Sequence, residues 1–113
     1  MAKHPCRVRK LRKSARLSQR ELAQLIGLHS QGVMSEIEAG SKRPSLIVAL
    51  ASAVVFEEPL ASIFPALSAH AERVVLASAL RLHKETEAAE NRSGAAAYLG
   101  TLIARLRHAD ASV

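Results

Sequence analysis

Basic side chains are concentrated at one end of the sequence, where they favour a polyanionic partner. Residues 1–20 contain eight Lys or Arg residues and no acidic residue, whereas the other 93 residues carry eight basic and ten acidic residues. This local positive charge favours nucleic acid as the partner, ahead of an anionic membrane surface or an acidic protein. The alternative is a solvated basic arm that has no partner.

Residues suited to catalysis or metal binding form no recognisable site in the sequence. The five histidines lack metal-ligand spacing, and no nucleophile with a base, Gly-rich phosphate loop or convergent carboxylate pair is evident. The single cysteine, Cys6, permits neither an internal disulfide nor a thiolate metal site. The sequence therefore predicts a protein that is not an enzyme and that holds no metal or other cofactor.

The same composition predicts a soluble, cytoplasmic protein without membrane contact. A lone cysteine suits a reducing compartment. The basic N-terminal residues are not followed by the apolar segment of a secretory signal. The longest apolar run, residues 46–56, is shorter than the roughly 20 residues that a membrane span needs.

The polar residues must be positioned by local structure, and residues 17–40 predict two short helices joined by a tight turn. Ser18 and Glu21 have the spacing of a capping box, which starts the first helix. Gly27 ends that helix, because glycine tolerates the left-handed conformation found after helix C-termini. The expected helices cover residues 19–26 and about 31–39.

Two short helices bury little by themselves and need flanking helices. Residues 7–16 predict an amphipathic basic helix, and Pro59 can begin a short helix that Pro65 ends. Residues 46–55 also predict a helix, but this one is apolar almost all round and must be covered all round. We infer that the C-terminal half or a second subunit packs on its outer side.

The C-terminal half predicts two more helices. Residues 66 to about 91 are helix-prone, Ser93 and Gly94 form the expected break, and a last helix runs from residue 95 to about 108. The apolar stripe of the last helix either folds back on the helix at 46–55 or pairs with its copy in a dimer. The first C-terminal helix has an apolar stripe formed by Leu67, Ala71, Val74 or Val75, Ala79 and Leu82.

Residues 7–65 carry a set of residues at characteristic spacing, namely Leu11, Leu17-Ser18-Gln19, Glu21-Leu22-Ala23, Ile26-Gly27, Ser35, Ile37-Glu38, Gly40, Pro44-Ser45-Leu46 and Ile63-Phe64. With this set the sequence resembles the lambda-repressor-like, XRE-type helix-turn-helix family. The resemblance implies an all-α fold, with a five-helix DNA-binding domain at 7–65 and a helical extension at 66–109 for dimerisation or partner binding.

The resemblance also implies which side chains read DNA. In this family the helix at 31–39 lies in the major groove while the helix at 19–26 crosses the backbone. Gln31 is then the principal base reader, since its amide can pair with N6 and N7 of adenine. The further base-reading candidates on or near the same side are His29, Ser30, Gly32 and Glu36.

The remaining site residues implied by the resemblance contact phosphate or hold the helices together. Arg12 and Glu38 match an ion pair between the first and third helices, so Glu38 is read as structural. Glu36 departs from the family pattern, in which many members carry a basic or amide side chain at this position. Its carboxylate can accept a hydrogen bond from cytosine N4 but otherwise repels phosphate. The expected phosphate contacts are Gln19, Arg20, Lys42 and Arg43.

These observations predict a sequence-specific DNA-binding transcriptional regulator that acts as a homodimer on a two-fold symmetric stretch of double-stranded DNA. The alternative is a protein-interaction module, such as an antitoxin, that neutralises a partner through its C-terminal helices. RNA binding is compatible with the charge, but three aromatic residues in the whole chain leave no stacking platform.

Overall fold

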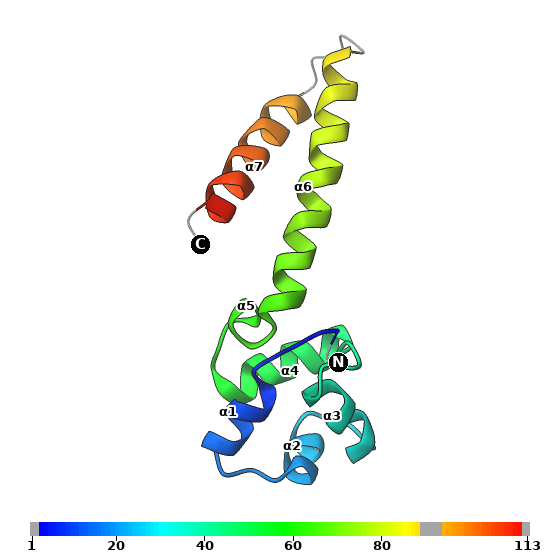
Figure 1. Cartoon of the computed structure of the whole chain (residues 1–113), viewed down its shortest axis with the longest axis vertical. Coiled ribbons are helices and arrows are strands. Elements are labelled where there is room, and N and C mark those ends of the chain that lie inside the picture. The colour runs from blue at the N-terminus through cyan, green and yellow to red at the C-terminus, as the bar shows by residue number, and fades with distance from the viewer. Residues whose placement is uncertain (1–2, 89–93, 112–113) are drawn as a thin grey trace. The chain divides into compact units, whose positions relative to one another are not determined.

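The computed structural model describes residues 3–88 and 94–111, and this part of the chain is helical with connecting loops (Figure 1). The predicted all-α class is confirmed. Two compact units divide the chain, Met1–Ala69 and His70–Val113. The helices are α1 (Val8–Ser14), α2 (Gln19–Leu25), α3 (Gln31–Glu38), α4 (Leu46–Phe56), α5 (Leu60–Ile63), α6 (Pro65–Ala88) and α7 (Gly94–Ala111).

Each expected helix is present, and the differences lie at the ends, where helices are least well defined. The sequence predicts that Pro65 ends a helix, but Pro65 is the first residue of α6. A proline costs nothing there, because the first turn of a helix leaves its N–H groups unpaired. The non-helical backbone of Phe64, with φ −122° and ψ 64°, is what separates α5 from α6. Pro59 precedes α5 as its N-cap and is not its first residue.

The expected break at Ser93 and Gly94 is described only in part. Ser93 lies outside the described residues, and Gly94 begins α7. The assignment of separate roles to residues 7–65 and 66–109 stays a prediction. No helix in the described part of the chain is long and apolar enough to cross a membrane.

The capping box predicted at Ser18 is present and fixes the start of α2. The Ser18 hydroxyl accepts a hydrogen bond from the Glu21 backbone N–H at 3.0 Å, and the Ser18 N–H donates to Glu21 Oε1 at 2.8 Å. After α2, Gly27 adopts φ +78°, which glycine accepts without steric cost. Together these two positions set the length of α2 and the direction in which the chain leaves it.

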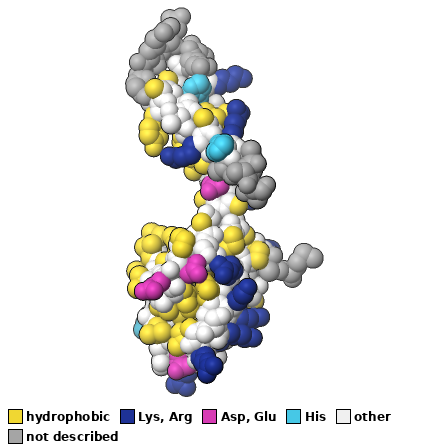
Figure 2. All heavy atoms as spheres, turned by 90° about the vertical axis from the view of Figure 1, so that its left-hand side faces the viewer, with side chains coloured by type: hydrophobic (Ala, Val, Ile, Leu, Met, Phe, Trp, Pro, Cys, Tyr) yellow, Lys and Arg dark blue, Asp and Glu magenta, His cyan; other side chains and the backbone are white. Residues whose placement is uncertain are grey.

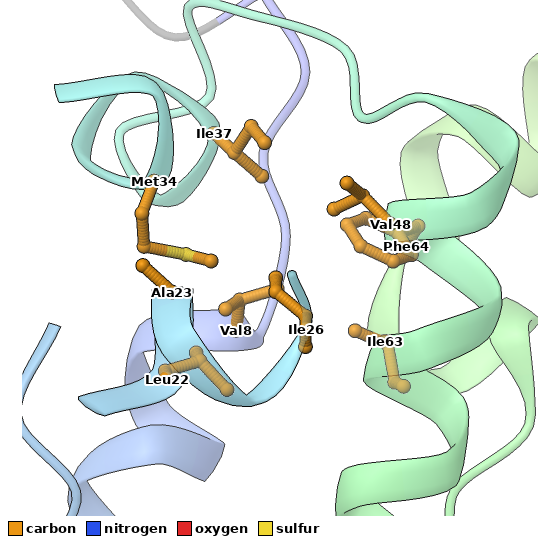
Figure 3. Close-up of a cluster of buried hydrophobic side chains, with 9 residues drawn as sticks. All are labelled: Val8, Leu22, Ala23, Ile26, Met34, Ile37, Val48, Ile63 and Phe64. Atoms are coloured by element: carbon orange, nitrogen blue, oxygen red, sulfur yellow. The ribbon is translucent and has the colours of Figure 1, made fainter. Parts of the chain in front are cut away.

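The N-terminal unit is built on one apolar cluster to which all of α1–α5 contribute. Figure 3 shows side chains from the α4 and α5 region facing those of α1, α2 and α3 across this cluster. Leu22, Met34 and Ile63 are fully buried within it. The complete set of buried residues is Val8, Leu22, Ala23, Ile26, Met34, Ile37, Val48, Ile63 and Phe64.

Helix α4 reaches this cluster with one side and exposes the other. Val48 and Ser52 are buried, and the Ser52 hydroxyl donates to the Val48 carbonyl at 2.8 Å, which satisfies the buried polar group. The outer side is apolar but has no cover within residues 3–69. Its exposed side chains are Leu46, Ile47, Leu50 and Val54.

The C-terminal unit has a small core between α6 and α7. Ala79 of α6 is buried together with Leu99 and Ile103 of α7. The stripe of α7 is thus used in packing on α6, an arrangement that neither of the two sequence-based alternatives included. Several apolar side chains of the predicted α6 stripe are exposed instead, namely Val74, Val75 and Leu82.

Removal of the α2 cap should destabilise the N-terminal unit. We expect Ser18→Ala to lower the free energy of unfolding of residues 3–69 by about 1 kcal/mol, because the Glu21 N–H loses its acceptor. The measurement is urea unfolding of the full chain followed by amide NMR signals of this unit. Ser14→Ala is the control, since the exposed Ser14 side chain caps no helix, and it should change the free energy by no more than about 0.5 kcal/mol. Equal effects of the two substitutions would contradict the role given to the cap.

Candidate nucleic-acid interface

Helices α2 and α3 are packed through their apolar sides, which turns the polar side of α3 outward. Met34 and Ile37 of α3 share the buried cluster with Leu22 and Ala23 of α2. Ser30 caps α3 by accepting a hydrogen bond from the Val33 N–H at 3.3 Å. The residues predicted to read bases are all exposed, at the turn before α3 or on its outer side: His29, Ser30, Gln31, Gly32 and Glu36.

Behind this exposed row lies a buried ion pair. The Glu38 carboxylate receives two hydrogen bonds from the Arg12 guanidinium, at 2.6 Å to Oε2 and 3.1 Å to Oε1. The side chain of Glu38 is 0% exposed and that of Arg12 is 12% exposed. Arg12 also donates to the Leu17 carbonyl at 2.9 Å, so the same side chain ties α1 to α3 and to the segment before α2.

Two further donors reach Glu38. Arg9 Nε lies 3.5 Å from Glu38 Oε1, and Gln19 Nε2 donates to the same oxygen at 3.0 Å. The sequence prediction included Arg12 but missed Arg9. Arg9 and Arg12 are three residues apart and therefore neighbours on a helix surface, but this spacing alone does not indicate that both reach Glu38.

The bond to Glu38 determines how the side-chain amide of Gln19 is turned. An ionised carboxylate only accepts hydrogen bonds, so the NH₂ group of Gln19 must face Glu38 and its oxygen must face away. That oxygen accepts a hydrogen bond from Gln31 Nε2 at 3.4 Å. Gln31 therefore has one N–H directed at Gln19, while its own oxygen and second N–H remain available for a ligand. The Glu38, Gln19 and Gln31 side chains form a continuous chain from the buried pair to the exposed row.

The ionisation of Glu38 is set by two opposed effects. Burial disfavours the carboxylate and acts to raise the pKa of Glu38, whereas hydrogen bonds from Arg12, Gln19 and Arg9 and the charge of Arg12 act to lower it. The favourable contacts prevail, and the pKa lies below the ordinary value of 4.5. Glu38 is accordingly an anion at neutral pH and holds Gln19 in one orientation.

Basic side chains flank the exposed row. Arg20, Lys42 and Arg43 are exposed, and in the view of Figure 2 Lys and Arg side chains gather along one edge of the N-terminal unit while hydrophobic side chains occupy the other. Lys42 Nζ lies 4.0 Å from Glu36 Oε2, with both side chains about half exposed, so this ion pair contributes little to stability. It does place a positive charge beside the carboxylate that would otherwise repel phosphate.

The structure therefore brings some predicted site residues into contact and leaves others separate. Gln19 contacts Gln31, Lys42 contacts Glu36, and Arg12 contacts Glu38. Within the described ranges, Arg20, Arg43 and His29 make no side-chain hydrogen bond or ion pair with the protein. Residues 3–88 and 94–111, which the structure describes, contain no group of three or more His, Cys, Asp or Glu side chains able to hold a metal ion.

Comparison with known proteins gives one result for this region. The family described as helix-turn-helix matches residues 8–63, about half of the chain. No curated protein matches the sequence at a significant level.

Because the pKa of Glu38 is lowered on folding, the stability that Glu38 contributes is present above pH 4.5 and is lost as the pH falls through the folded-state pKa. We expect Glu38→Gln to destabilise the protein by about 3 kcal/mol at neutral pH, since Arg12 is left buried without its counter-ion. The stability of this variant should also change less than that of the parent between about pH 5 and pH 3. Urea unfolding of the full chain at several pH values measures both effects. Glu72→Gln, at an exposed position of α6, is the matched control; the same pH profile in both variants would contradict the assignment.

Proposed function

Since the chain belongs, through residues 8–63, to the lambda-repressor-like, XRE-type helix-turn-helix family of DNA-binding domains, we propose that it is a sequence-specific regulator of transcription. The observation that carries this proposal is the exposed polar row at the start of α3, backed by Gln19 at the start of α2. In helix-turn-helix proteins these two helix starts meet the DNA, with the second helix in the major groove.

Gln31 is the proposed base reader. Among the described residues its amide oxygen and one N–H have no protein partner, which is the combination that an adenine requires through N6 and N7. The contact with Gln19 limits the rotation of the Gln31 side chain before DNA is bound. Less conformational entropy is then lost on binding, so the contact supports both affinity and specificity.

The neighbouring positions add to readout or to docking. We assign His29, Ser30, Gly32 and Glu36 to the base-facing side, with Glu36 accepting a hydrogen bond from cytosine N4. Lys42 offsets the charge of Glu36 at 4.0 Å and reduces its repulsion of the DNA backbone. The proposed phosphate contacts, which position the domain without reading sequence, are the side chains of Arg20, Lys42 and Arg43 and the backbone N–H of Gln19 at the start of α2, because the Gln19 side-chain amide is held by Glu38 and Gln31.

The regulator is proposed to bind as a homodimer to two half-sites. A two-fold dimer places two recognition helices on successive major grooves, about 34 Å apart. The helical extension, residues 66–109, is the proposed dimerisation region, because the α6–α7 core contains three buried residues and leaves Val74, Val75 and Leu82 exposed.

A second function is supported by the same exposed side chains. Exposed apolar side chains on α6 and α7, including Tyr98, suit a partner protein that the chain neutralises, as an antitoxin does. Isolation of the native protein as a free homodimer with no partner retained would count against this function.

The experiment that tests the main proposal is fluorescence anisotropy of the full chain with random-sequence duplexes at several salt concentrations, followed by competition with DNA that flanks its own coding region. A regulator gives affinity that falls steeply with salt and one flanking segment that competes far better than bulk DNA. Equal and weak competition by every segment would reject sequence-specific regulation.

Substitution of Gln31 should change specificity, and substitution of Arg43 should not. We expect Gln31→Ala to reduce the preference for the best flanking segment by about 1–3 kcal/mol, because the contact to a base is lost. Arg43→Ala should weaken binding to all sequences alike and reduce the slope of log affinity against log salt by about 1. Both are measured by the same competition assay. An unchanged sequence preference in Gln31→Ala would show that another residue reads the bases.

A further inference from the structure

The outer side of α4 is an exposed apolar row of unusual regularity. Leu46, Leu50 and Val54 follow one another at intervals of four residues and are 73%, 44% and 78% exposed, and Ile47 beside them is 69% exposed. Residues four apart lie on the same face of a helix, so these side chains form one continuous stripe. A contiguous exposed apolar stripe marks a site of interaction more often than an isolated exposed leucine does.

This stripe is symmetric about its centre. Leu50 is the middle residue, Leu46 and Val54 stand four positions to either side, and α4 itself contains no charged residue. The flanking charges are opposite in sign, with the exposed Arg43 seven positions before Leu50 and the exposed Glu57 seven positions after it. A second α4 laid antiparallel across the first would therefore place apolar against apolar and the basic end of each helix against the acidic end of the other.

A groove beside the stripe provides the complementary shape. It has a volume of about 300 Å³ and an almost entirely apolar lining that includes Leu46 and Ala49 of α4 with Leu60, Phe64 and Leu67. Antiparallel pairing brings the partner's Val54 next to Leu46, at the edge of this groove. In an isologous two-fold contact both copies use the same surface. Each copy therefore supplies projecting side chains and also the groove that receives the side chains of the other copy.

We propose that two copies of this chain bind each other through antiparallel α4 helices, with Leu50 at the two-fold axis. Leu46 packs against the partner's Val54, and Arg43 pairs with the partner's Glu57. In this pairing Arg43 is taken from the phosphate contacts proposed above, which are then Gln19, Arg20 and Lys42. This contact lies between two N-terminal units and goes beyond the proposed function, which places dimerisation in residues 66–109. Because the test below uses no DNA, its failure would leave the regulator proposal standing.

Disulfide cross-linking of the full chain tests the proposal. Residues on a two-fold axis face their own copies, so Leu50→Cys in a Cys6→Ser background should form a covalent dimer on mild oxidation. The control is Leu25→Cys in the same background, since Leu25 is a 59% exposed leucine on α2. We expect the Leu50 variant to cross-link roughly tenfold or more faster than the control, because a held pair reacts at a far higher effective concentration than colliding molecules.

A Leu50→Cys rate no higher than that of Leu25→Cys would overturn the proposal, and labelling of the same cysteine by a thiol reagent would then identify the other occupant. Slow labelling without cross-linking would mean that this chain's own C-terminal helices cover α4. Fast labelling without cross-linking would mean that the stripe is open to a different protein.

Exchange of the flanking charges is a second, independent test. In the Leu50→Cys background, Arg43→Glu or Glu57→Lys alone should slow cross-linking several-fold, because like charges then meet at both ends of the pair. The double exchange restores opposite charges and should restore the rate. A double variant that stays as slow as the single ones would show that Arg43 and Glu57 do not meet, and would exclude the antiparallel register.

Discussion

The arrangement of the N-terminal unit depends on the buried ion pair between Glu38 and Arg12. A carboxylate with no exposed surface is stable only if its charge is compensated, and here one guanidinium and two further donors compensate it. These donors come from α1 and from the first residue of α2, so the position of Glu38 fixes α3 against both helices. The two hydrogen bonds from Arg12 also fix the relative orientation of the two side chains, because a planar guanidinium that donates two bonds to a carboxylate lies in the plane of that carboxylate.

The same ion pair connects the interior of the unit with its proposed DNA-binding surface. Glu38 orients the amide of Gln19, and the oxygen of Gln19 in turn receives a hydrogen bond from Gln31. An exposed glutamine on an isolated helix would sample several rotamers. In this protein the orientation of the proposed base reader is linked through two hydrogen bonds to a buried charge, which is how a small domain can pre-organise a polar side chain on its surface.

Helix α4 differs from the ion pair in that it exposes apolar side chains at the surface. Its inner side completes the core through Val48, while its outer side exposes leucine, isoleucine and valine. The sequence predicts that such a helix is covered on every side, because its residues are apolar in every direction. That cover stays a prediction, since the outer side is exposed in the described residues. Which positions face inward was not evident from a pattern that has no polar side, and the packing of Ile63 and Phe64 decided it.

The sequence by itself determined where α2, α3 and α4 begin and where α2 ends. Ser18 with Glu21, Ser30, Ser45 and Gly27 act through hydrogen bonds or backbone angles within a few residues, so their effects can be recognised locally. The family pattern likewise marked Arg12 with Glu38 and the exposed row around Gln31. Only the tertiary structure decided that Arg9 joins Glu38, that Gln19 links Glu38 to Gln31, that α7 packs on α6, and that Pro65 begins a helix. The physical reason is that these features depend on side chains from separate helices meeting in space, or on how a neighbouring segment bends, and neither is specified by local spacing.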